Sequence, residues 1–120
     1  MNNQPAKVVS LHPYFKVHPG KLDGFKTLMR EFVARAASEP ARLFYDFTVN
    51  GDEVFCREFY EDAAGALAHL ENVDAQLKAA LKIADLVRLE LHGPAAELDK
   101  LRAPLAGLNP AWFVRECGVE

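Results

Sequence analysis

The chain has 120 residues, of which 50% are hydrophobic and 26% are charged, a composition that suits one globular domain with one core. The formal net charge is −3 and the lysines and arginines form no basic stripe, so nucleic-acid binding is not expected. The sequence contains no apolar run near the ~20 residues that span a bilayer and no secretory leader, so we expect a cytoplasmic protein without a membrane partner.

The first half of the chain predicts a strand followed by a helix. Residues 1–6 are expected to be a disordered lead. Residues 7–17 alternate as a strand, which Pro13 interrupts; because proline lacks a backbone donor, we expect a sheet edge or a bulge there. The apolar face of this strand would carry Val9, Leu11, Phe15 and Val17. Residues 21–38 repeat apolar side chains at helical spacing, and Pro40 ends that helix.

Residues 42–61 predict a β-hairpin, because Asn50 and Gly51 both tolerate the positive φ of a type I′ turn. This turn would pair Val49 with Asp52 and Phe47 with Val54. One face of the hairpin would carry Leu43, Tyr45, Phe47, Val54, Cys56, Glu58 and Tyr60. The other would carry three phenylalanines, Phe44, Phe55 and Phe59, among Asp46, Thr48 and Arg57. Since neither face is purely polar, we expect a second copy of the chain to cover the second face.

The second half predicts a helix, a strand and an extension. Asp62 is a plausible N-cap for a helix that breaks around Asn72 and Val73, and Asp74 would cap its continuation. Residues 85–93 alternate as a strand, with Val87, Leu89 and Leu91 on one side. Residues 94–108 predict a short helix, and residues 110–117 a further strand or an arm. The order β-α-β-β-α-β predicts an α+β, ferredoxin-like fold with an antiparallel sheet that carries its helices on one face.

Three segments resemble the antibiotic biosynthesis monooxygenase family of dimeric α+β barrels: VHPGKLDGF before the first helix, SEP at its exit, and REFYEDAAGALAHL at the strand-to-helix corner. The resemblance covers residues 7–92 and leaves 93–120 as an extension that packs on the domain or on a partner. It implies a homodimer with its sheets face to face and a pocket between helices and sheet in each subunit. For some members it also implies oxidation of a small phenolic or quinol-type substrate by O2, without metal or flavin.

His69 lies about 100° round its helix from the centre of the apolar side, so the sequence alone leaves two readings: a boundary histidine half in water, or a pocket residue. The resemblance places a pocket histidine at this point. The partners of His69 would be Tyr45, Glu58 and Tyr60, which share one face of the hairpin. The alternative is that the two tyrosines are core residues and that Glu58 pairs with an arginine. We therefore predict catalytic roles for His69 as base, Glu58 as orienting carboxylate and Tyr60 as positioning group. The predicted substrate contacts are Tyr45, His12, Phe25 and Met29.

No cofactor is predicted. The two cysteines form no metal-like cluster and the four histidines show no ligand spacing. The haem-degrading branch of the superfamily would need an asparagine near Pro13 and a tryptophan at the place of Tyr60, so haem is not expected. We expect a cofactor-independent monooxygenase acting on a small aromatic or quinol-like molecule. An isomerase or ligand-binding member of the same barrel, and a dimerisation scaffold with a self-filled pocket, stay open as alternatives.

Overall fold

The computed structural model describes residues 6–119, so residues 1–5 of the predicted lead lie outside the described part of the chain. The strands are β1 (Val9–Val17), β2 (Arg42–Asn50), β3 (Glu53–Tyr60), β4 (Ala84–Gly93) and β5 (Ala111–Val114). The helices are α1 (Leu22–Ala36), α2 (Ala63–Asn72), α3 (Asp74–Ile83) and α4 (Ala95–Leu105), with a 3-10 turn η1 (Ala106–Leu108) after α4. No helix in residues 6–119 combines the length and the apolar character needed to cross a membrane.

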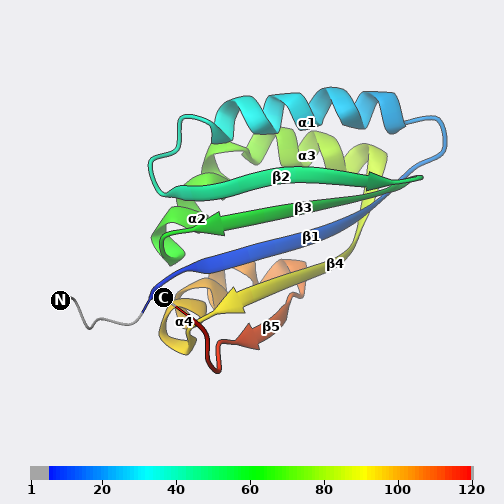
Figure 1. The fold of residues 1–120 in the computed structure, drawn as a ribbon. Coiled ribbons are helices and arrows are strands. Elements are labelled where there is room, and N and C mark those ends of the chain that lie inside the picture. Colours follow the sequence, from blue (N-terminus) through cyan, green and yellow to red (C-terminus); the bar gives the residue numbers. More distant parts are fainter. Residues whose placement is uncertain (1–5, 120) are drawn as a thin grey trace.

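All five strands form one sheet in the order β2-β3-β1-β4-β5, and the helices lie over one of its faces (Figure 1). The first four strands pair antiparallel, and β5 adds in parallel to β4. The predicted α+β, ferredoxin-like order is therefore confirmed, with β5 as an additional strand. The face without helices is called the outer face below.

Strand β1 lies in the middle of the sheet, so the expectation that Pro13 marks an edge is wrong. The expected irregularity is present, because the pairing of β1 with β4 shifts between Tyr14 and Phe15. Tyr14 pairs with Arg88 and Phe15 with Leu86, which leaves Val87 as the extra residue. Val87 is consequently 60% exposed, and its predicted place beside Leu89 and Leu91 is wrong.

The hairpin forms, but its predicted register is wrong by two residues. Asn50 pairs with Glu53 and Val49 with Val54, so the turn residues are Gly51 and Asp52. Gly51 alone of the predicted turn pair has a positive φ, of 61°. A shift of two residues leaves the side chains from Tyr45 to Glu58 on their predicted faces, because strand side chains alternate with period two. Leu43 is the exception, because the pairing shifts between Arg42 and Phe44, and it is 48% exposed.

The helix boundaries follow local signals. Asp62 caps α2, since its Oδ1 accepts a hydrogen bond from the Gly65 N–H at 2.8 Å. The predicted cap at Asp74 is wrong: Val73 occupies the N-cap of α3, and Asp74 pairs with Lys78 instead. Val73 ends α2, where its N–H donates to the His69 carbonyl, and begins α3, where its carbonyl accepts from the Leu77 N–H, so the two helices meet at this one residue.

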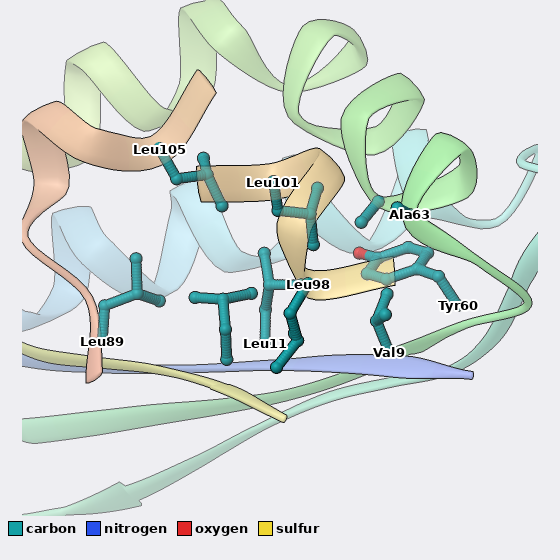
Figure 2. Packing of buried hydrophobic residues seen from close by; sticks show 10 residues of the cluster. Val9, Leu11, Tyr60, Ala63, Leu89, Leu98, Leu101 and Leu105 are labelled. Atoms are coloured by element: carbon teal, nitrogen blue, oxygen red, sulfur yellow. The ribbon is translucent and has the colours of Figure 1, made fainter. Parts of the chain in front are cut away.

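The C-terminal extension packs on the domain. Leu98, Leu101 and Leu105 of α4 lie against Leu11 of β1 and Tyr60 of β3 in one buried cluster (Figure 2). The Glu97 carboxylate accepts a hydrogen bond from the Ala63 N–H at 3.0 Å, which satisfies a free donor at the start of α2. A second buried cluster forms around Phe15, Phe25 and Phe32 beneath α1 and α3.

Candidate active site

A cavity between sheet and helices is lined by residues of both buried clusters. The cavity has a volume of about 50 Å3. Its polar wall comprises Tyr45, Cys56, Glu58 and His69. The remaining wall is apolar and comprises Leu11, Pro13, Phe15, Phe32, Phe47, Leu70, Val73, Leu77, Leu86, Leu89, Leu105 and Leu108.

His69 is only 2% exposed, so the expectation of a histidine half in water is wrong. Its ring lies between the rings of Tyr45 and Tyr60, with centroids 5.0 and 5.2 Å away. Nδ1 is 2.9 Å from both carboxylate oxygens of Glu39, and Nε2 is 3.4 Å from Oε1 of Glu58. Hairpin side chains thus cover the flank of α2 that the helix alone would leave at the surface.

Glu39 is the residue that sequence reasoning missed as a site residue. Glu39 lies between the end of α1 and Pro40. In the sequence, a residue before proline at this point indicates only that the helix ends. The Asn72 side-chain amide at the end of α2 donates to Glu39 Oε2 at 2.7 Å and to the Arg35 carbonyl at 3.1 Å. Because an ionised carboxylate only accepts hydrogen bonds, Glu39 requires the proton on His69 Nδ1 and leaves Nε2 as the acceptor in the neutral ring.

Glu58 is 5% exposed and lies on β3 beside the histidine. Burial raises the pKa of its carboxyl above the usual range, although His69 and the hydrogen bond from Tyr60 pull that pKa down. The Tyr60 hydroxyl donates to Oε1 at 2.8 Å. The carboxyl partners are therefore a tyrosine and a histidine, not an arginine, and burial shifts its protonation toward the neutral acid relative to an exposed glutamate.

The other polar groups of the wall stay uncharged. Burial, followed by the charge of Glu58, raises the pKa of the Tyr45 and Tyr60 hydroxyls above their usual range. Burial likewise raises the pKa of the Cys56 thiol. Tyr45 faces the cavity, whereas Tyr60 is fully buried behind Glu58 and acts on the cavity only through that carboxyl.

Three predicted substrate contacts lie away from the cavity. His12 is on the outer face, where Nε2 is 2.8 Å from Ser10 Oγ and its ring contacts His92 at a centroid distance of 4.8 Å. Its even position in β1 turns it away from the helices, so its placement in the pocket is wrong. Phe25 is fully buried against Phe15, at a centroid distance of 5.3 Å, and Met29 packs on the same cluster.

The structure therefore brings together His69, Glu58, Tyr60 and Tyr45 of the predicted set and adds Glu39. A potential base, His69 Nε2, and a carboxyl whose pKa is raised by burial lie 3.4 Å apart at the wall of an apolar cavity. In so apolar a space, each hydrogen bond and charge interacts more strongly than in water. Within residues 6–119 no cluster of three His, Cys, Asp or Glu side chains is arranged to bind a metal ion.

The sequence matches no protein-family model and no curated protein. Among solved structures, MupZ from Pseudomonas fluorescens is 39% identical over 95% of this chain and 94% of its own, with a TM-score of 0.90. A candidate antibiotic biosynthesis monooxygenase from Nitrosomonas europaea is 16% identical over 78% of this chain and 96% of its own, with a TM-score of 0.68. Another from Caulobacter crescentus is 19% identical over 72% and 88%, with a TM-score of 0.65. The last two are similar in fold alone.

Proposed function

We propose that the cavity of this chain, whose fold is that of antibiotic biosynthesis monooxygenases, is the active site of a proton-transfer enzyme. The substrate is a small, mostly apolar molecule that carries an oxygen-bearing polar group. The observation that supports this most strongly is the imidazole of His69, held between the carboxyl groups of Glu39 and Glu58 beside the cavity.

His69 is the proposed base. Glu39 fixes the ring through Nδ1, so Nε2 accepts a proton from a substrate O–H or C–H bond. The imidazolium that forms is stabilised by the Glu39 carboxylate, in the way that a carboxylate supports the histidine of a catalytic triad. Asn72 in turn keeps the Glu39 carboxylate in place.

Glu58 is the proposed acid. In its neutral form it donates a proton to a second atom of the substrate while His69 removes one from the first. Such a paired transfer moves a hydrogen within the substrate and changes no oxidation state. The presence of both an acid and a base favours an isomerase-type reaction, with Tyr45 as a hydrogen-bond partner of the substrate oxygen.

A cofactor-independent monooxygenase is the second candidate, and the apolar wall of the cavity favours it. O2 is apolar and a phenol or quinol ring fits a hydrocarbon wall, so both reactants would collect there. This reaction uses the base alone: His69 deprotonates the hydroxyl, and the electron-rich anion reacts with O2. One oxygen atom enters the substrate as a carbonyl oxygen and the other leaves as water; the substrate loses two hydrogens to that water and supplies all four electrons, so no external reductant is needed.

Two assays on the purified protein separate these candidates. Solvent deuterium incorporation into a panel of small enolisable ketones, followed by NMR, reports proton transfer. Oxygen uptake with hydroquinones and naphthols, after subtraction of autoxidation, reports the oxygenase. His69→Ala should abolish the activity, whereas His18→Ala is the matched control because His18 is partly exposed and pairs with Asp85 away from the cavity. Exchange and uptake that survive in His69→Ala would refute both assignments.

We also propose that the partner is a second copy of the chain, bound through the outer face. That face carries Phe44, 46% exposed, and Val87, 60% exposed, together with the aromatic rings of Tyr14, Phe55 and Phe59. Exposed apolar side chains in such a group are typical of an interface. Sedimentation should give a dimer at micromolar concentration, and a monomer would contradict the proposal.

A further inference from the structure

The cavity is too small in this form to hold a substrate. Its volume of about 50 Å3 is enough for one or two water molecules. Pockets that bind small organic molecules measure roughly 300–1,000 Å3. If the proposed active site takes a substrate, part of its wall must therefore move.

The turn η1 is the part of the wall with the least support. Of the lining residues, Leu108 alone lies on a 3-10 turn. The others lie on strands or α-helices, except Val73, which joins α2 to α3 and is 1% exposed. Ala106, Gly107 and Asn109 around it are exposed. The turn ends with a backbone hydrogen bond from the Asn109 N–H to the Ala106 carbonyl at 3.1 Å. Exposed backbone with few buried contacts is typical of segments that open locally.

The residues beside η1 make it a short hinge. Pro104 lies within the last turn of α4, where it supplies no N–H for the helix. Gly107 has no side chain to restrain the backbone, and Asn109 has a positive φ of 49°. Two side chains of this region line the cavity: Leu105, which precedes Ala106 and Gly107, and Leu108, which follows them.

The segments on either side of the hinge are anchored. Upstream, Leu98 and Leu101 of α4 are fully buried, and Glu97 binds the start of α2. Downstream, β5 pairs with β4, and the Arg115 N–H donates to the Gly93 carbonyl at 2.8 Å. Between these anchors, residues 106–110 are the stretch with the fewest contacts to the rest of the fold.

From these observations we propose that residues 106–109 are the gate of the cavity and that Leu108 is its moving side chain. Opening of η1 withdraws Leu108 from the wall and gives access to the polar groups at Cys56, Glu58 and His69; closure excludes water from the bound substrate. This inference rests on the proposed function for its purpose, but the motion can be measured without any substrate.

Cys56 reports the opening directly. Its thiol lines the cavity and is 1% exposed, so a reagent reaches it only when a wall moves. The exposed Cys117 is replaced by serine in every sample. The rate of Cys56 alkylation by iodoacetamide, followed by intact mass, then measures access to the cavity in the folded protein.

Two glycine substitutions distinguish gate opening from general unfolding. A methyl group at Gly107 would meet no heavy atom within 4 Å, so Gly107→Ala fits the closed form and restricts the hinge. Gly24→Ala in α1 is the matched control, because its methyl group would make an ordinary contact with Ile83 at 3.8 Å and would stabilise the fold far from η1.

We expect Gly107→Ala to slow alkylation of Cys56 by about two- to fivefold, Leu108→Ala to accelerate it, and Gly24→Ala to leave it unchanged. Equal slowing by both glycine substitutions would show that the reagent enters through global unfolding, and no slowing by Gly107→Ala would show another entrance. Either result would refute the proposal that residues 106–109 open the cavity. Neither depends on whether His69 transfers protons, so failure of the gate and failure of the proposed function are distinguishable.

Discussion

Replacing Glu39 by glutamine changes the tautomer that His69 can adopt. Both oxygens of Glu39 accept hydrogen bonds, from His69 Nδ1 at 2.9 Å and from the Asn72 amide at 2.7 Å. Glutamine offers one acceptor and one donor group in the same shape. If the glutamine oxygen faces His69, the glutamine NH2 group meets the NH2 group of Asn72, and two donors oppose each other. If the glutamine NH2 group faces His69, Nδ1 must accept a hydrogen bond, and the ring carries its proton on Nε2.

The cost follows from these contacts. A hydrogen bond to a charged group contributes about 1.5–3 kcal/mol and a neutral one about 0.5–1.5 kcal/mol, so Glu39→Gln should destabilise the fold by about 1–2 kcal/mol. Solvent screening reduces this little, because the side chain of Glu39 is 11% exposed and that of His69 is 2% exposed. The same substitution should lower the proposed proton-transfer rate, since the base then holds its proton on the nitrogen that must accept one.

Nitrogen chemical shifts of the neutral His69 ring report the tautomer, and denaturant unfolding reports the stability. The matched control is Asp46→Asn on the outer face, where Asp46 binds Arg57 in solvent and its loss should matter little. An unchanged tautomer with equal stability loss in the two variants would refute the argument that Glu39 orients His69.

Three further variants test the surroundings of the site. Burial raises the pKa of Glu58 above 4.5, so the folded state keeps a proton that the unfolded state loses. The stability of the fold should therefore decrease as pH rises from 4.5 through the raised pKa. Thermal unfolding of Glu58→Gln should not show this decrease. Glu97→Ala removes the acceptor of the Ala63 N–H and should cost about 1–2 kcal/mol in denaturant unfolding, a value near zero contradicting its capping role. Gly65→Ala would place a methyl group 2.7 Å from the Ala41 side chain, so its melting temperature should fall despite the better helix propensity, and a rise would show that the contact relaxes freely.

The positions of the elements and the inward faces of most strands could be predicted from the sequence. Alternation in β1 and β3 placed Phe15, Cys56 and Glu58 toward the helices, and the Asp62 cap marked the start of α2. These are local properties, because a strand repeats every two residues and a helix cap needs only three residues beyond it. The hairpin register and the exposure of Val87 were mispredicted because each depends on how neighbouring strands pair, which no local pattern records.

Local sequence patterns were thus enough to locate the strands and helices and to place Tyr45, Glu58 and Tyr60 on one face. The burial of His69, its pairing with Glu39 and the position of His12 on the opposite side of the sheet arise from packing between distant segments. The physical reason is distance along the chain. Glu39 and His69 are 30 residues apart and meet because α1 and α2 pack on the same sheet, and the burial that favours the neutral form of Glu58 comes from elements throughout the chain.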